Sequence, residues 1–311
     1  MKLYTSLNSL PKLKKKSAVT IGVFDGVHVG HRRLLENAIA CAQTTGGKSV
    51  VITFTGHPSK HLHENSDIKL IKSTKAKIKS IKSHGIDICV LLDFKKIHNK
   101  TALEFIEDIL VKKLNAGCVS EGEDFVFGKG GTGNIELLKA QGKKHGFKVN
   151  VVPAVKICGK RVSSTCIRQF LKAGEIEKAE KMLGRQYAIT GKVMRGRHIG
   201  FDYPTANLSL DYEDIPARGV WAVKVEYKGK TYTGAANIGF APTLKQEKKQ
   251  LLEVYIFNFS GNIYGEEIRV IFLERLRDEI KFATKEALMK QVREDINYIK
   301  NKYDSKLRGQ K

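Results

Sequence analysis

Apolar positions in the first part of the chain alternate between short runs and longer stretches with helical spacing. Residues 17–24 form an apolar run, and a helical pattern begins near Leu34 after a turn rich in glycine and histidine. Further strands are predicted at 50–54, 86–92 and 149–152, and further helices at 75–82, 102–114 and 135–145. Strands that alternate with helices are typical of a parallel α/β sheet.

The pattern changes after two short helical stretches at 165–173 and 176–183, which end at Gly184. Apolar and polar residues then alternate in short segments separated by turn residues, at 188–193, 219–227, 231–236, 252–259 and 267–272. This alternation predicts an antiparallel β-barrel or sandwich, closed by an amphipathic helix at 285–299. We therefore expect two domains, 1–184 and 185–311.

The composition is that of a folded protein. The 311 residues are 41% hydrophobic and 28% charged, which excludes a mainly disordered or low-complexity chain. Five cysteines form no C-x-x-C pair, so neither a zinc site nor a disulfide framework is indicated. No apolar run approaches about 18 residues, the length of a membrane span, and no signal-peptide core is found. We expect a cytoplasmic protein with no membrane association.

The net charge of +23 predicts attraction to polyanions and nucleotides. Lysine-rich stretches at 12–16 and 69–82 leave RNA binding open as an alternative. No aromatic residues interleave with these lysines to stack on bases, so a solvated basic face is favoured and no specific nucleic acid is expected.

The turn at residues 22–31 is the first candidate site. It lies between a predicted strand and a predicted helix, where free backbone N–H groups form an anion site. Gly22, Gly26 and Gly30 permit close backbone approach, while His28 and His31 can donate to phosphate oxygens. Such groups stabilise charge that develops on an α-phosphate during nucleotidyl transfer.

The ordered string G-x-F-D-G-x-H-x-G-H at 22–31 resembles the H-x-G-H nucleotidylyltransferase superfamily, and in particular the FAD synthetase module of bacterial bifunctional riboflavin kinase/FAD synthetases. This resemblance implies that His28 and His31 are catalytic. It also implies ATP binding by Gly22, Phe24, Asp25 and Gly30.

A second phosphate element lies at residues 161–168, where hydroxyl groups open a predicted helix. The hydroxyls can cap that helix and still donate to phosphate, and Arg168 can make a charge-assisted contact. The string resembles the S-S-T-x-I-R motif of the same family. The resemblance implies that Ser164, Thr165 and Arg168 hold the outer ATP phosphates and the pyrophosphate leaving group.

Two further strings, at 54–58 and 122–129, match the same module. The first carries Gly56 where the family usually has proline, and it places His57 and Pro58 on the flavin side. The second runs into a G-x-G-x-x-G loop at 128–133. A dinucleotide-binding interpretation of that loop fails because residues 137–160 contain no acidic residue to bind a ribose. We assign Asp124 and Phe125 to FMN or adenine.

The β-rich half contains a basic, glycine-rich loop that ends in a hydroxyl and an amide two residues apart. If the chain is extended there, Thr205 and Asn207 point to the same side, and hard Mg²⁺ prefers such oxygen ligands. The P-T-A-N string at 204–207 resembles the signature of riboflavin kinases. The resemblance implies Mg·ATP binding by Thr205 and Asn207, with Gly196 and Arg197 on the ATP phosphates.

Glu253 is a single carboxylate on a predicted apolar strand. By itself it is an outward charge on an edge strand, but the resemblance places the family's catalytic glutamate here, as the base for the riboflavin 5′-hydroxyl. Arg277 and Glu279 are expected near flavin, or in a surface ion pair. The chain departs from the family pattern by an insertion at 202–203, by Trp221 for tyrosine, and by Tyr255 and Asn258 for histidine and aspartate.

These features predict a bifunctional enzyme: a kinase that converts riboflavin to FMN, and an adenylyltransferase that converts FMN to FAD. The resemblance implies ATP as co-substrate, Mg²⁺ as cofactor, and riboflavin and FMN as partners. Two alternatives stay open: another H-x-G-H nucleotidylyltransferase with an inactive β-half, and the basic RNA-binding protein. The sequence does not determine the oligomeric state.

Overall fold

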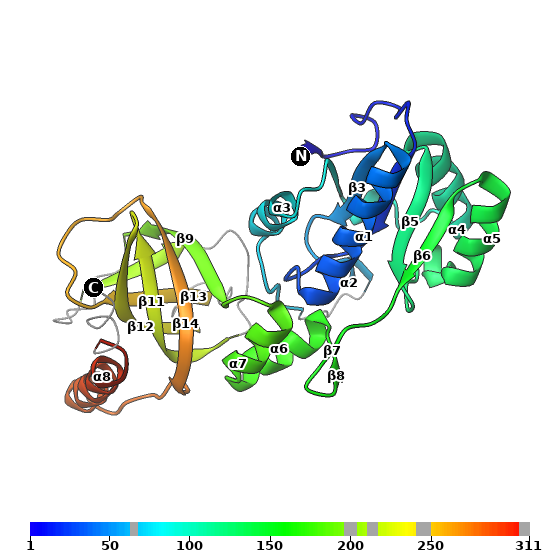
Figure 1. Cartoon of the computed structure of the whole chain (residues 1–311). Helices are drawn as coiled ribbons and strands as arrows, with labels where there is room; N and C mark the ends of the chain where they lie inside the picture. The colour runs from blue at the N-terminus through cyan, green and yellow to red at the C-terminus, as the bar shows by residue number, and fades with distance from the viewer. Residues whose placement is uncertain (63–67, 196–203, 210–216, 241–249, 305–311) are drawn as a thin grey trace. The chain divides into compact units, whose positions relative to one another are not determined.

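The computed structural model describes residues 1–62, 68–195, 204–209, 217–240 and 250–304, which form two compact units (Figure 1). The first unit is Met1–Ser164 and the second is Thr165–Lys311. The sequence pattern places the boundary 20 residues later, because the helical residues 165–184 precede the first strand of the β-rich part. Their assignment to the first catalytic domain stays a prediction.

The first unit is built on a parallel sheet, as predicted, and its strand order is β1-β4-β3-β2-β5-β6. From β2 the chain proceeds outward through β3 and β4, and then returns to place β5 on the other side of β2. The order therefore reverses between β2 and β5, which is where open α/β sheets bind ligands. The strands are β1 (Lys2–Tyr4), β2 (Ser17–Ile21), β3 (Lys48–Phe54), β4 (Ile88–Leu92), β5 (Ala116–Gly122) and β6 (Lys148–Val152).

Helices cover both faces of this sheet because its inner strands bury alternate side chains on opposite sides. Val51 packs with Leu35 of α1 and Ile81 of α3, whereas its neighbour Val50 packs with Ile106 and Leu138 on the other face. The longer helices are α1 (Val29–Thr45), α3 (Thr74–Ser83), the π-helix η2 (Phe105–Lys113) and α5 (Ile135–His145). Short elements complete the unit: α2 (Ser59–Leu62), η1 (Phe94–Lys96), α4 (Ala102–Glu104), η3 (Lys129–Gly131), β7 (Lys156–Ile157) and β8 (Lys160–Arg161).

The sequence pattern missed strands β1, β5, β7 and β8 of this unit and simplified one helix. β5 escaped prediction because Gly117, Ser120 and Glu121 interrupt its apolar run, although the strand is nearly all buried. β1 is only three residues long. The helix expected at 102–114 is a single α-helical turn followed by the π-helix.

The second unit is a closed antiparallel barrel with the order β10-β13-β12-β11-β14-β9, which decides between the barrel and the sandwich. Its strands are β9 (Ala188–Met194), β10 (Thr205–Ser209), β11 (Gly219–Tyr227), β12 (Lys230–Phe240), β13 (Gln250–Ile256) and β14 (Glu267–Arg277). Its helices are α6 (Ser164–Ala173), whose first residue closes the first unit, then α7 (Ile176–Leu183), α8 (Lys285–Ile299) and η4 (Lys300–Asp304). No helix within the described ranges is long and apolar enough to cross a membrane.

The side chains of barrel strand β13 alternate between the barrel core and the outer side of the barrel wall. Leu252, Val254 and Ile256 are buried, while the intervening Glu253 and Tyr255 are half-buried on the opposite side. Ile296 and Ile299 of α8 pack over that second side in one cluster with Tyr255. Glu253 therefore points away from the barrel core, toward the face that α8 covers.

Candidate active sites

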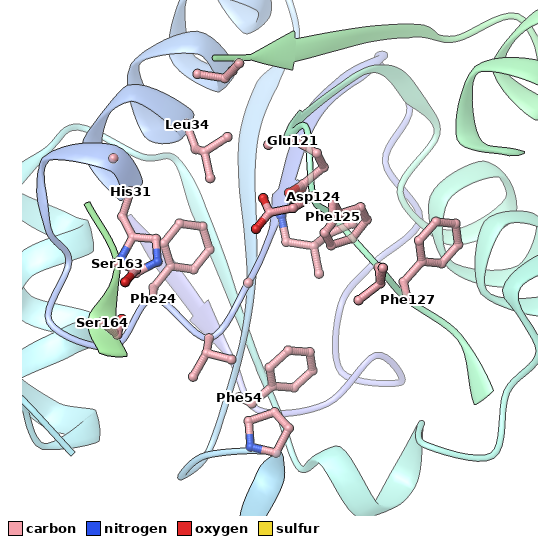
Figure 2. Close-up of a pocket in the computed structure, with 18 of the residues that line it drawn as sticks. Phe24, His31, Leu34, Phe54, Glu121, Asp124, Phe125, Phe127, Ser163 and Ser164 are labelled. Carbon is pink, nitrogen blue, oxygen red and sulfur yellow. Dashed lines mark hydrogen bonds between the residues drawn. The ribbon is translucent and has the colours of Figure 1, made fainter. Parts of the chain in front are cut away.

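A cavity of about 560 Å³ opens at the carboxyl ends of the parallel strands in the first unit (Figure 2). Its wall includes the ends of β2, β3 and β5, so it lies at the reversal of strand order. Most residues predicted for adenylyl transfer line it: Gly22, Phe24, His28, Gly30, His31, His57, Pro58, Asp124, Phe125 and Ser164.

The loop from β2 to α1 contains three residues in the left-handed backbone region, which most amino acids disfavour. Phe24 and Val27 have positive φ angles of 51° and 43°, although neither is glycine. Gly26 also has a positive φ, and a Cβ there would lie 3.1 Å from Ile71. Non-glycine residues in this region cost conformational energy, and such strain clusters at functional sites.

His28 and His31 stack face to face where α1 begins. Their ring centroids are 3.6 Å apart with an interplanar angle of 13°. His28 is the N-cap of α1, and its Nδ1 accepts the backbone N–H of His31 at 3.2 Å. A neutral His28 therefore carries its proton on Nε2, which is a donor for an anion. Gly30 lets the rings approach, since a Cβ there would lie 3.2 Å from the His28 ring.

Asp25 has a different environment from its neighbours. Its buried carboxylate accepts hydrogen bonds from the backbone N–H of Ile71 at 3.0 Å and of Lys72 at 3.3 Å, and it is absent from the cavity wall. The backbone carbonyl of Asp25 accepts the Ser164 hydroxyl at 2.9 Å. Burial lowers the pKa of nearby Lys77 to about 8, against the opposing charge of Asp25. Phosphate binding by Asp25 stays a prediction.

An aromatic wall occupies the part of the cavity formed by β3 and the loop after β5. Phe125 and Phe127 stack at 5.3 Å, Phe105 lies 5.6 Å from Phe127, and Phe54 meets Phe94 edge to face at 5.6 Å. Such a surface suits a flat heteroaromatic ring. Only Phe125 was predicted for this role. Phe54 and Phe127 lie in the strings at 54–58 and 122–129 but were given no role, and Phe94 and Phe105 lie outside every quoted motif.

The S-S-T-x-I-R element lies where the two units divide. Ser163 and Ser164 line the cavity (Figure 2), while Thr165 and Arg168 follow on α6 in the second unit. In the first unit, Arg161 of β8 forms an ion pair of 2.5 Å with Asp124, and both residues line the cavity. Asp124 therefore already has a cationic partner at the edge of the site.

The barrel carries a second cavity of about 280 Å³, bounded by β12, β13, the segment after β14, and α8. Four residues predicted for the kinase reaction line it: Thr205, Glu253, Arg277 and Glu279. Apolar side chains of α8, among them Leu288 and Ile296, form the opposite wall. The cavity thus combines two carboxyl groups and one guanidinium with an apolar surface.

Three polar residues stand in one row across the barrel wall. Glu253 of β13 is directly opposite Asn207 of β10 on one side and Asn237 of β12 on the other. Residues directly opposite in an antiparallel sheet point to the same side. Asn237 had escaped prediction: it is one polar residue in a strand, and only strand register places it next to Glu253.

The carboxyl group of Glu253 has an altered affinity for protons. Burial raises its pKa above the ordinary value, and the negative charge of Glu279 raises it further. Glu279 in turn accepts a hydrogen bond of 3.4 Å from the amide of Asn237. A carboxylate with a raised pKa is a stronger base, which suits removal of a proton from an alcohol.

Arg277 is held by α8. Its guanidinium donates to Asp295 through Nε at 3.0 Å and through a terminal nitrogen at 2.8 Å, and Gln291 also donates to Asp295 at 3.2 Å. The Arg277 guanidinium lies 5.8 Å from the centre of the Phe282 ring. Arg277 thus forms a largely buried ion pair with Asp295, which differs from the surface ion pair that the sequence left open.

The predicted metal ligands are oxygen donors beside Glu253. The side-chain nitrogen of Asn207 donates to the carbonyl oxygen of Thr205 at 3.4 Å, so the Asn207 oxygen is the atom that suits a hard cation. The described residues contain no group of three or more histidine, cysteine, aspartate or glutamate side chains that could hold a metal. Gly196 and Arg197, together with the insertion at 202–203, lie outside the described residues.

Comparison with protein families assigns both parts of the chain. The FAD synthetase family matches residues 10–166, and the riboflavin kinase family matches residues 183–303. The first match contains the stacked histidines, and the second contains the whole barrel.

Full-length relatives carry both parts together. Bifunctional riboflavin kinase/FMN adenylyltransferases are 39% identical in Buchnera aphidicola subsp. Schizaphis graminum, with 98% of this chain and 99% of the relative covered, and 34% identical in Haemophilus influenzae, with 98% and 100% covered. The Escherichia coli K12 relative of the same name is 34% identical, with 95% and 96% covered.

A solved structure shares the fold over nearly the whole length. It is a Streptococcus pneumoniae protein described as a macrolide-efflux protein, with a TM-score of 0.82, 31% identity, and 96% of this chain and 98% of that chain covered. Because both halves match, the alternative of an inactive β-half is not supported, and the predicted bifunctional enzyme is confirmed. The chain therefore belongs to the bifunctional riboflavin kinase/FMN adenylyltransferase family, which makes FMN and then FAD with ATP.

Proposed function

We propose that the two cavities divide the two reactions: FMN adenylylation takes place in the cavity at the parallel sheet, and riboflavin phosphorylation in the cavity at the barrel. The observation that carries this division is that the candidate catalytic groups of the two reactions line different cavities. The stacked histidines at the start of α1 line one cavity, and the carboxyl group of Glu253 lines the other. The corresponding domains are 1–184 and 185–311.

In the kinase cavity, Glu253 is the general base. It takes the proton of the riboflavin 5′-hydroxyl while that oxygen bonds to the γ-phosphorus of ATP, and the bond to the bridging oxygen breaks to release ADP. The raised pKa of Glu253 makes it a better proton acceptor than an exposed carboxylate. Arg277 and Glu279 contact the flavin ring, which lies against the apolar side of α8.

In the adenylyltransferase cavity, a phosphate oxygen of FMN attacks the α-phosphorus of ATP, and pyrophosphate leaves with the bridging oxygen. No protein nucleophile is needed. His28 and His31 donate to the α-phosphate as charge develops, and the first N–H groups of α1 add to the same field. Ser164, Thr165 and Arg168 hold the outer phosphates, and the aromatic wall with His57, Pro58 and Phe125 receives the flavin ring.

Mg²⁺ is the cofactor in this proposal, and Thr205 and Asn207 would hold it beside Glu253. Their neutral oxygens fit a hard cation that also binds phosphate oxygens and water. When bound, Mg²⁺ neutralises charge on the phosphates of ATP. A cytoplasmic location is also part of this proposal, because five cysteines without a disulfide framework are typical of reducing compartments.

The test separates the two reactions in the full-length protein. Riboflavin with Mg·ATP, or FMN with Mg·ATP, is incubated with each variant, and FMN and FAD are measured by chromatography. The double change His28→Ala and His31→Ala is expected to abolish FAD formation and to preserve FMN formation, while Glu253→Gln is expected to do the reverse. Loss of both activities from either change, in a protein with an unchanged melting temperature, would contradict two separate cavities.

A further inference from the structure

Glu121 is a buried carboxyl group in the wall of the adenylyltransferase cavity that the mechanism above does not use. It is the sixth residue of β5, only 1% exposed, and it lines the cavity near Asp124 and Phe125 (Figure 2). Carboxyl groups are almost never fully buried unless they have partners. Its position in the wall of a substrate cavity calls for a chemical role.

One oxygen of Glu121 completes the backbone hydrogen bonding of the sheet. β2 and β5 are paired as far as Val19 and Val119, and beyond that point the strands diverge. The backbone N–H of Ile21 then donates to Oε1 of Glu121 at 2.5 Å, in place of a strand carbonyl. This bond fixes the Glu121 side chain in the crevice where the strand order reverses, which is the ligand-binding end of the sheet.

The surroundings of Glu121 favour its uncharged form. Burial raises its pKa well above the ordinary value, while hydrogen bonds from the Ile21 N–H and the Thr20 side chain act in the opposite direction. No charged partner of Glu121 is found among the described residues. The neighbours that face it are Thr20 and Ile21 on β2 and Val151, its register partner on β6. The titratable groups that line the same cavity are His28, His31, His57, His98, Asp124 and Arg161. A protonated carboxyl group carries one O–H donor as well as acceptor capacity.

We propose that Glu121 is a substrate-binding residue of the adenylyltransferase: it acts as a neutral acid that donates a hydrogen bond to an acceptor atom on the edge of a heteroaromatic ring. With Oε1 taken by the Ile21 N–H, the other oxygen is the one that can carry the proton. The aromatic wall beside Glu121 is the part of the cavity that suits a ring. The stacked histidines and the amides of α1 serve the phosphates.

The neutral form also explains how an acidic residue is compatible with this site. FMN and ATP both bring several negative charges into the cavity, and an ionised Glu121 would repel them at low effective dielectric. A protonated carboxyl group avoids that repulsion, and its hydrogen bond can still orient the substrate ring. The ring belongs either to adenine or to flavin, and these two sources share the same acceptor chemistry.

The experiment compares Glu121→Gln with Glu121→Val in steady-state FMN adenylylation, with ATP and FMN varied separately. Glutamine keeps an acceptor for Ile21 and an N–H donor for the ring, so KM and kcat are expected to stay within about twofold of the parent protein. Valine removes both groups, so the KM of one substrate is expected to rise about three- to tenfold, with a much smaller change in kcat. A rise in the KM of FMN would show that Glu121 binds the flavin ring, and a rise in the KM of ATP would show that it binds adenine.

The pH dependence provides a readout that a structural role would not change. In the parent protein the same KM is expected to rise with increasing pH as Glu121 ionises, and Glu121→Gln is expected to remove that rise. A rise with pH that persists in Glu121→Gln would overturn the proposal, as would unchanged KM values for both substrates in folded Glu121→Val. If Glu121→Val does not fold, the pH profile of Glu121→Gln decides alone.

This inference rests on the placement of adenylylation in the first cavity, and the riboflavin kinase activity of the same preparations separates the two ideas. Kinase activity is expected to be unchanged in both Glu121 variants. If His28→Ala with His31→Ala fails to affect FAD formation, the placement itself is wrong. If that double variant behaves as expected and Glu121→Val does not, only the role of Glu121 is wrong.

Discussion

The ammonium group of Lys77 donates a hydrogen bond of 2.7 Å to the backbone carbonyl of Phe54, in a position where the lysine is almost wholly buried. The same nitrogen donates to the carbonyl of Val23 at 3.0 Å, and Asp25 provides the nearby negative charge. Phe54 ends β3, and Val23 follows β2. One buried cation therefore links the two loops that carry the stacked histidines and His57.

Lys77→Met is expected to lower the free energy of unfolding by about 3 kcal/mol, because it leaves two carbonyls without a donor and removes the positive charge near the buried Asp25 carboxylate. Urea unfolding at neutral pH measures this change. Lys79→Met, on the exposed side of the same helix, is the matched control and is expected to change stability by less than about 0.5 kcal/mol. Equal effects of the two changes would contradict the anchoring role.

The pH dependence of stability follows from the same lysine. Its pKa in the folded protein is lowered from 10.5 to about 8, so between these values the unfolded chain binds more protons than the folded chain. Stability contributed by Lys77 therefore increases with pH in this window, with a slope that approaches about 1.4 kcal/mol per pH unit. The difference in unfolding free energy between the parent protein and Lys77→Met is expected to grow from pH 8 to pH 10. A constant difference would show that the lysine is not perturbed.

His28→Asn separates the capping role of His28 from its chemical role. Asparagine is a good N-cap and replaces the acceptor for the His31 N–H, so the melting temperature is expected to change little. The imidazole donor is lost, so kcat for FMN adenylylation is expected to fall about 100-fold or more. The riboflavin kinase activity of the same sample is the internal control. Retention of most adenylylation activity would show that His28 acts only as a cap.

Glu279→Gln is expected to shift the acidic limb of the kinase pH profile. The charge of Glu279 raises the pKa of Glu253, so its removal lowers that pKa, and the base becomes active at lower pH. The profile of kcat/KM against pH for riboflavin phosphorylation measures the shift. Asp278→Asn is the control, since Asp278 pairs with Arg275 and does not shift Glu253. A limb that stays in place, or moves to higher pH, would refute the coupling.

Asp295→Asn tests whether α8 positions Arg277. The amide keeps the size of the side chain and loses the charge that accepts two guanidinium hydrogen bonds. KM for riboflavin is expected to rise about tenfold, with adenylylation of supplied FMN unchanged. Glu294→Gln, exposed on the same helix, is the matched control. If the Asp295 variant loses stability with no change in KM, the ion pair is only structural.

Local patterns predicted much of this protein. The alternation of apolar runs with helical stretches gave the parallel α/β part, and the two-residue periodicity after Tyr187 gave the β-rich part. Motifs close in sequence, such as the turn that carries His28 and His31, were also visible, because their chemistry is encoded within one loop. β5 was missed because glycine and glutamate are typical of loops. Only pairing with the strands on both sides, β2 and β6, places this segment inside the sheet.

Sequence by itself determined the succession of elements and the short phosphate-handling motifs, because both depend on neighbouring residues. Only the tertiary structure decided which distant residues share a cavity. The aromatic wall from Phe54 to Phe127, the opposition of Asn237 and Glu253 across two strands, and the bond from Ile21 to Glu121 all depend on strand order and register. Register is set by packing over the whole sheet, so no local stretch of the chain contains it.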